Sequence, residues 1–186
     1  MEPIKVFAVA GSLRAGSFNR KLLAAAVRKI KDAVVDVADL KEFDLPLYDC
    51  DLEAKGLPSG VVRLKERIAA ADALLIATPE YNWSIPGTFK NAIDWASRPP
   101  SNPFRGKTAL ITAASDGHFG GTRSVLHLRQ VFVTLGVLAI PEQVTVPHAD
   151  KAFDEAGNFI DPKLDARLQK AVDALIRVTT ALKASK

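Results

Sequence analysis

The sequence predicts a doubly wound α/β fold of five parallel strands, organised as one domain over residues 1–186. Short apolar runs alternate along the chain with segments whose apolar residues recur at helical spacing. Hydrophobic residues make up 48% of the chain, which is enough for a substantial core at this length. We find no internal repeat or linker. Alternating strands and helices of this kind favour a parallel sheet covered by helices on both faces.

Three strands are expected in the first half of the chain, separated by two helices. The predicted elements, in order, are a strand at Ile4–Ala10, a helix carrying Leu22 to Ile30, a strand at Val34–Leu40, an irregular connection over Glu42–Pro58, a helix at Gly60–Ala71 and a strand at Ala73–Thr78. The first strand is small and apolar throughout except for one lysine, which is typical of a buried parallel strand.

Two more strands and three helices are expected in the second half. They are a helix at Thr88–Ser97 with a buried stripe at Phe89, Ala92, Ile93 and Ala96, a strand at Thr108–Ala114, a helix ending near Leu135, a strand within Val137–Val146, an excursion over Pro147–Pro162 and a last helix. Pro141 interrupts or precedes the fifth strand. Asp161 and Pro162 provide the N-cap and first position of the last helix.

The stretch Gly11–Arg20 joins the first strand to the first helix and predicts an anion site. Backbone N–H groups and the helix dipole both favour an anion at such a turn. Ser12, Ser17 and Asn19 add neutral donors and Arg14 a charged one. The alternative is that Ser17 or Asn19 only caps the helix. The dinucleotide and triphosphate glycine motifs are absent, so a phosphate monoester fits best.

Unusual loops follow the first, third and fourth strands, which are neighbours in the strand order 2-1-3-4-5. The second loop offers Tyr81, Asn82 and Trp83 between two prolines, and this set suits a flat ring with polar edges. The third contains Gly117, Gly120 and Gly121, against which a ring could lie. A phosphate monoester joined to a flat heterocycle describes FMN.

Each of these loops also has a simpler interpretation. Tyr81 and Trp83 could pack internally or against another subunit, and for Trp83 we favour the subunit contact. Gly120 and Gly121 could only start the next helix. His118 could be a solvated side chain, which is the commoner state of a lone loop histidine.

Composition excludes several other classes of protein. The single cysteine, Cys50, cannot form an internal disulfide, and three scattered histidines suggest no metal site. The net charge of +4 is spread without a basic stripe, so nucleic acid is not an expected partner. No apolar run is long enough to span a membrane, and strand 1 follows Met-Glu-Pro at once, so we expect a cytoplasmic protein without a signal peptide.

Three motifs resemble the NAD(P)H-dependent FMN reductase family, and within it the quinone reductases also described as chromate reductases. They are Gly11-Ser12-Leu13-Arg14 through Ser17-x-Asn19, Pro79-Glu80-Tyr81-Asn82-x-Ser84-x-Pro86-Gly87-x-x-Lys90-Asn91-Ala92-Ile93-Asp94-Trp95, and Gly120-Gly121-x-Arg123. The resemblance implies a flavodoxin-like fold, bound FMN, reduction of quinones or other small acceptors by NADPH or NADH, and a homodimer or homotetramer.

The resemblance also implies the roles of individual residues. Those expected around the phosphate are Ser12, Arg14, Ser17, Phe18 and Asn19; those around the ring are Pro79, Glu80, Tyr81, Asn82, Ser115, Gly117, Gly120 and Gly121; and those at the subunit contact are Tyr81, Arg123 and Glu142. No catalytic side chain is expected, because the flavin N5 carries the chemistry. Ser115-Asp116-Gly117-His118 departs from many relatives, which leaves the acceptor open.

Three functions remain in competition at this point. The first is a reductase with a ping-pong cycle, in which NAD(P)H and the acceptor use one pocket in turn. In that case Arg14 and Arg123 would attract the phosphates of the nicotinamide cofactor and anionic acceptors such as chromate. The second is a flavodoxin-type electron carrier that oxidises no nicotinamide. A cofactor-free domain on the same fold is a third possibility.

Overall fold

The computed structural model describes residues 2–185 and contains a five-stranded sheet, all parallel, in the order β2-β1-β3-β4-β5. The strands are β1 (Ile4–Ala10), β2 (Ala33–Ala38), β3 (Ala73–Ala77), β4 (Thr108–Ala114) and β5 (Leu138–Val146). The predicted fold class and strand order are therefore confirmed. Strand β2 ends two residues earlier than predicted, because Asp39 caps a 3₁₀ helix that begins at Leu40.

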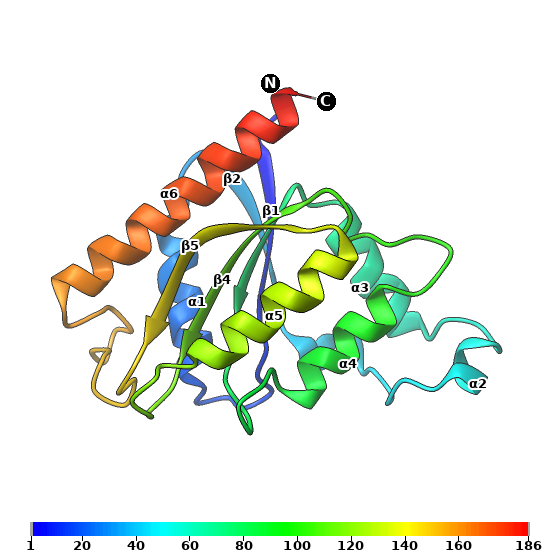
Figure 1. Cartoon of the computed structure of the whole chain (residues 1–186), viewed down its shortest axis with the longest axis horizontal. Coiled ribbons are helices and arrows are strands. Elements are labelled where there is room, and N and C mark those ends of the chain that lie inside the picture. Colours follow the sequence, from blue (N-terminus) through cyan, green and yellow to red (C-terminus); the bar gives the residue numbers. More distant parts are fainter. Residues whose placement is uncertain (1, 186) are drawn as a thin grey trace.

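Helices cover both faces of the sheet (Figure 1). The long helices are α1 (Phe18–Lys29) and α6 (Pro162–Ala184) on one face, and α3 (Ser59–Ala69), α4 (Gly87–Ala96) and α5 (Thr122–Leu135) on the other. Side chains of β1 alternate between the two faces of the sheet. Val6 and Ala8 pack with α1, whereas Phe7 and Val9 pack with α4. The sheet is thus buried from both sides.

The connection predicted as irregular over Glu42–Pro58 is partly helical, which corrects that prediction. It includes the end of η1 (Leu40–Phe43) and all of α2 (Cys50–Glu53), whose N-caps are Asp39 and Asp49. Elements of four residues are too short for a hydrophobic period to reveal them. The segment is anchored on the buried Trp95, whose indole N–H donates to the Pro46 carbonyl at 2.8 Å.

Strand β5 lies at the edge of the sheet and runs through Pro141 without a break. Its register shifts beside the proline, since Ala139 pairs with Ala109 and Gln143 with Ile111. Arg129 of α5 donates to carbonyls along this irregular stretch, at 2.6 Å to that of Ile140. Burial lowers the pKa of Arg129, and the nearby Glu142 partly opposes this effect.

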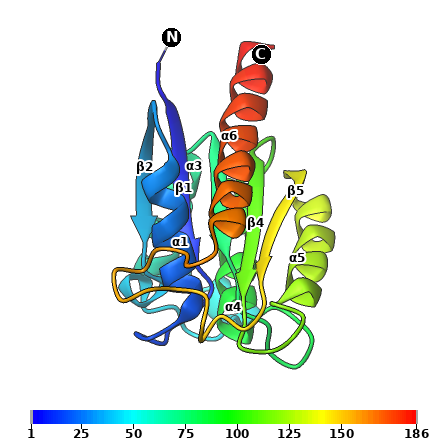
Figure 2. The same cartoon turned by 90° about the vertical axis from the view of Figure 1, so that its left-hand side faces the viewer.

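The carboxyl ends of all five strands point to one end of the molecule, where the connecting loops gather (Figure 2). The opposite end holds the N-terminus of β1 and the C-terminal turns of α6 (Figure 2). The predicted helix start at Asp161 and Pro162 is confirmed, since the Asp161 side chain accepts from the N–H of Lys163. Within residues 2–185 no helix has the length and apolar character of a membrane span.

We expect Asp72 to make stability depend on pH. Burial raises the pKa of Asp72, but hydrogen bonds from the Lys5 N–H and from Lys183, each 2.9 Å, outweigh burial and lower it. A lowered pKa contributes stability above about pH 4, the unfolded value, which is lost as the pH falls through the folded value. In urea unfolding, Asp72→Asn should have a lower free energy of unfolding than the parent protein near neutral pH. This difference should shrink toward about pH 3.

The control for this experiment is Asp150→Asn, which changes an exposed aspartate. This variant should follow the parent protein at both pH values. A deficit in Asp72→Asn that stays the same in acid would show that the ionised carboxylate is not what stabilises the fold.

Candidate functional site

The three predicted loops meet around a cavity of about 210 Å³ at the carboxyl ends of β1, β3 and β4, here called the loop hollow. Its lining is Ser12, Arg14, Ser17, Phe18, Asn19, Pro79, Glu80, Tyr81, Ala114, Ser115 and Asp116. Most of the predicted site residues are therefore neighbours in space. Asn82, Gly117, Gly120 and Gly121 stand outside this lining, although they belong to the same loops.

The β1–α1 loop presents donors to the hollow. The side chains of Ser12 and Ser17 are buried, and their hydroxyl oxygens accept from the backbone N–H groups of Arg14 (3.3 Å) and Asn19 (3.2 Å). Ser17 thus does cap α1, as the simpler interpretation required. Because each oxygen accepts an N–H, its own hydrogen is available to donate to an anion.

Backbone groups of the same loop add further donors. Within residues 2–185 the N–H groups of Leu13, Ala15 and Gly16 have no acceptor, and these residues are exposed. Arg14 donates to the Gly16 carbonyl at 3.1 Å, and its guanidinium lies 5.5 Å from the centre of the Phe18 ring. The two hydroxyls and Arg14 line the hollow, and the unengaged N–H groups belong to the same loop. Donors of these kinds match the acceptor oxygens of a phosphate.

Asn19 fixes the distance between the first and third loops. It is buried, its amide nitrogen donates to the Ala114 carbonyl at 2.8 Å, and its amide oxygen accepts from the Ala114 N–H at 2.9 Å. Both ends of this side chain are therefore engaged with the end of β4. Asn19 lines the hollow and holds it in shape.

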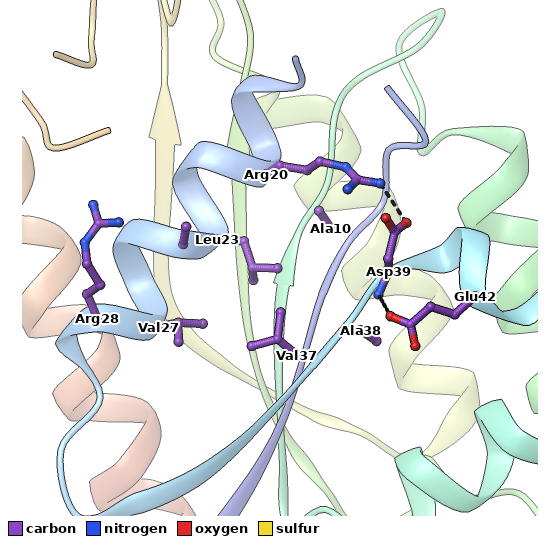
Figure 3. A pocket seen from close by; sticks show the side chains of 10 residues that line it. Ala10, Arg20, Leu23, Val27, Arg28, Val37, Ala38, Asp39 and Glu42 are labelled. Carbon is purple, nitrogen blue, oxygen red and sulfur yellow. Dashed lines mark hydrogen bonds and ion pairs between the residues drawn. The ribbon is translucent and has the colours of Figure 1, made fainter. Parts of the chain in front are cut away.

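Arg20 supports the loop and was not identified from the sequence. Its guanidinium donates to the Ser12 carbonyl at 3.4 Å and pairs with Asp39 at 2.6 Å. The pair stands at the mouth of a larger cavity of about 480 Å³ between α1 and β2 (Figure 3). Leu23, Val27 and Val37 point into this cavity (Figure 3). Its size exceeds that of the loop hollow, but its charged side chains are already engaged: Arg20 pairs with Asp39, and Arg28 donates to the Gly157 carbonyl at 2.8 Å. We therefore take the loop hollow as the candidate site.

Arg123 joins the second loop to α5. It pairs with Glu80 at 2.8 Å, and the second carboxylate oxygen of Glu80 accepts from the Arg123 N–H at 2.9 Å. The guanidinium lies between two exposed rings, 4.1 Å from the centre of Trp83 and 4.3 Å from that of Phe119. The Glu80 pairing was another contact that the sequence did not reveal.

The tip of the second loop has an unusual backbone. Asn82 and Trp83 have φ values of 47° and 66°, and Tyr81 and Ser84 exchange hydrogen bonds of 2.9 and 3.0 Å across them. Positive φ at both central residues is the geometry of a tight hairpin turn and is costly for a tryptophan. The turn therefore holds Tyr81 and Trp83 exposed at the rim of the hollow.

The two adjacent glycines of the third loop are required by packing. A Cβ at Gly120 would lie 2.6 Å from the Pro147 nitrogen, and one at Gly121 would lie 2.7 Å from the Ala113 Cβ. Their φ values are 58° and 84°. These glycines let the loop lie against the ends of β4 and β5. His118 is exposed, and its ring centre lies 5.8 Å from that of His148.

Comparison with known proteins identifies the family. The sequence model of the NADPH-dependent FMN reductase family matches residues 4–151. This chain belongs to that family. An NAD(P)H-dependent FMN reductase of Pseudomonas aeruginosa is 46% identical over 176 residues, covering 94% of each chain. A quinone reductase of Escherichia coli is 43% identical over 164 residues, covering 86% of this chain and 87% of its own.

The fold of this chain also agrees with that of a solved structure of a related protein. The flavoenzyme NAD(P)H:(acceptor) oxidoreductase of Paracoccus denitrificans superposes with a TM-score of 0.85 at 36% identity, covering 96% of this chain and 98% of that one. The residues of the loop hollow fit the FMN of this family, because two hydroxyls and Arg14 line the cavity and the same loop carries unengaged N–H groups. Within residues 2–185 no cluster of His, Cys, Asp or Glu could hold a metal ion.

We predict that Ser12→Ala weakens FMN binding by roughly 10-fold to 100-fold, the loss of one charge-assisted hydrogen bond of about 1.5 to 3 kcal/mol. The measurement is a fluorescence titration of the apoprotein with FMN and, separately, with riboflavin, which lacks the phosphate. Only FMN should lose affinity.

A matched control for Ser12→Ala is Ser101→Ala, which changes an exposed serine outside the loop hollow. It should bind both flavins like the parent protein. An unchanged FMN dissociation constant in Ser12→Ala, or an equal loss for riboflavin, would contradict the phosphate assignment.

Proposed function

We propose that this protein is a two-electron quinone reductase that uses NAD(P)H in a ping-pong cycle with bound FMN. The observation that carries the proposal is the donor-lined loop hollow in a chain of the FMN reductase family. Relatives over 40% identical are named quinone reductases, which supports quinones as the acceptor class. Chromate is a further acceptor that we propose.

The roles proposed for the residues follow from their positions. Ser12, Ser17, Arg14 and the exposed N–H groups would hold the phosphate, with Phe18 and Asn19 shaping the cavity around it. The ring would be bounded by Pro79, Glu80, Tyr81, Asn82, Ser115, Gly117, Gly120 and Gly121. When bound, FMN supplies the redox chemistry by taking two electrons from NAD(P)H and giving them to the acceptor. The chain then contributes position and electrostatics.

One ion pair and one exposed arginine set the electrostatics of this site. Glu80 is neutralised by Arg123, so no unpaired carboxylate of the second loop opposes negative charge in the hollow. Arg14 is exposed at the first loop, and we propose that it attracts the phosphates of NAD(P)H and anionic acceptors. Arg123 would assist from the rim while holding its two loops together.

A flavodoxin-type electron carrier is the competing function. Proteins that dock to basic partners are commonly acidic, whereas this chain has a net charge of +4, which favours the reductase.

We predict that NADPH, mixed without oxygen with the FMN-loaded protein, bleaches the flavin absorbance within one turnover, and that a quinone added later restores it. Stopped-flow absorbance measures both steps. Steady-state rates at several quinone concentrations should give parallel double-reciprocal lines. Absorbance that stays constant with both NADPH and NADH would sink the reductase proposal and favour the carrier.

We further propose that the protein assembles as a homodimer or homotetramer through one flank. Exposed apolar residues follow this flank along α5 and its neighbours, namely Trp83, Leu126, Val133 and Leu138. Leu126 and Val133 are one heptad apart and share a face of the helix. Glu142 on β5 has a buried carboxylate oxygen without a hydrogen-bond partner among the described residues. Tyr81, Arg123 and Glu142 would supply the polar part of this contact.

Val133→Glu should therefore shift the protein to a smaller species in analytical ultracentrifugation, because Val133 is 77% exposed on the proposed flank and a charge there opposes burial. Val34→Glu is the control, since Val34 is 54% exposed on β2 at the other edge of the sheet. Equal sedimentation of the parent and both variants would exclude this flank as the contact.

A further inference from the structure

A second cavity lies beside the loop hollow, beyond the end of β5 and next to the start of α6. Its volume is about 490 Å³, and we call it the α6 hollow. Its lining is Thr145, Pro147, His148, Lys151, Ala152, Ile160, Asp161, Lys163, Leu164 and Arg167. The segment between β5 and α6 that forms much of it runs along the loop end of the sheet (Figure 2).

The two hollows share a wall of backbone. The Ala149 N–H donates to the Ser115 carbonyl at 3.0 Å, and the Ser115 N–H donates to that of Val146 at 3.1 Å. His148, which lines the α6 hollow, donates its N–H to the Gly117 carbonyl at 3.5 Å. The segment that lines the α6 hollow is thus hydrogen-bonded to the third loop, whose Ser115 lines the loop hollow.

The cations of the α6 hollow have few partners in the fold, since of their three side chains only that of Arg167 is engaged among the described residues, by donating to the Gln143 carbonyl at 3.3 Å. Within the part of the chain that the structure describes, Lys151, Lys163 and Arg167 pair with no carboxylate. By contrast, Lys29 pairs with Asp165 and Lys90 pairs with Asp94, each at 2.7 Å.

The nearby carboxylate is already engaged. Asp161 caps α6 by accepting from the Lys163 N–H at 2.8 Å. Three cationic side chains and one carboxylate line the α6 hollow, so its surface has a net positive charge.

Charge and shape together indicate the chemistry of the ligand. Three unpaired cations favour a phosphate monoester, which carries close to two negative charges. Pro147, Ile160 and Leu164 give the same cavity an apolar wall, and Ile160 is 63% exposed. A ligand that combines a phosphate monoester with a flat ring satisfies both halves of the lining.

We propose that the α6 hollow binds the adenosine 2′-phosphate end of NADPH and makes this protein select NADPH over NADH. The proposal rests on the reductase function, because NADPH must be the electron donor. Its nicotinamide would reach the neighbouring loop hollow while its adenosine end occupies the α6 hollow. NADH lacks the 2′-phosphate, so the cations of the α6 hollow act only on NADPH. Lys151, Lys163 and Arg167 are then the specificity-determining residues.

The direct test is calorimetric binding of 2′,5′-ADP and of 5′-AMP to the FMN-loaded protein. We expect 2′,5′-ADP to bind at least tenfold more tightly than 5′-AMP. Lys163→Ala and Lys151→Ala should each lower the affinity for 2′,5′-ADP by roughly 10-fold to 100-fold, as expected for the loss of a hydrogen bond to a charged group. Lys55→Ala, at an exposed lysine outside the hollow, should change nothing.

Kinetics supply a second readout. In Lys163→Ala the KM for NADPH should rise by a similar factor, whereas the KM for NADH and the kcat with either donor should stay near the parent values. Equal affinity for 2′,5′-ADP and 5′-AMP, displacement of 2′,5′-ADP by equimolar inorganic phosphate, or an equal rise of both KM values would overturn the proposal.

The test separates this proposal from the reductase function. If NADH bleaches the flavin but 2′,5′-ADP does not bind, the assignment of the α6 hollow fails and the reductase stands. If 2′,5′-ADP binds through Lys151 and Lys163 but neither donor bleaches the flavin, the reductase function fails.

Discussion

The bridge between Asn19 and Ala114 is the interaction on which the loop hollow depends. It joins the first turn of α1 to the last residue of β4, at 2.8 and 2.9 Å, across the ends of β1 and β3. Asn19 is 2% exposed, so the loss of its amide would leave a buried N–H and a buried carbonyl unpaired, at a cost of about 1–3 kcal/mol each. The bridge fixes the cradle of the first loop relative to the third.

The parallel sheet explains why three distant loops can serve one ligand. All strands point the same way, and β1, β3 and β4 are adjacent, so the loops that follow them emerge side by side. Each is then held by a different contact: the first by Arg20, the second by the Glu80–Arg123 pair, and the third by close packing at its glycines. The rigidity of the hollow comes from these contacts more than from the loops themselves.

The sequence was sufficient to predict the sheet order, the long helices and most of the lining of the hollow. The helices follow from periodicity, which is a local property. The sheet order came from the predicted fold class, and Phe18, Pro79, Glu80 and Ser115 were expected from the resemblance to the family. The partners of Asn19, Arg20 and Glu80 lie 95, 19 and 43 residues away, so no local pattern could reveal them. Gly121 was interpreted either through a ligand or as the start of the next helix, and the structure bears out the second interpretation, because Gly121 is the N-cap of α5. Its φ of 84° and the nearby Ala113 Cβ already require glycine.

Arg123 links the loop hollow to the flank of α5, because it contacts one residue of each. Its carboxylate partner Glu80 lines the loop hollow, while Trp83, which stacks on its guanidinium, is 68% exposed on the flank proposed for assembly. A second copy seated on Trp83 would desolvate this guanidinium and strengthen its attraction to Glu80. Assembly would then stiffen the second loop, so the proposed contact between subunits and the shape of the loop hollow would depend on the same ion pair.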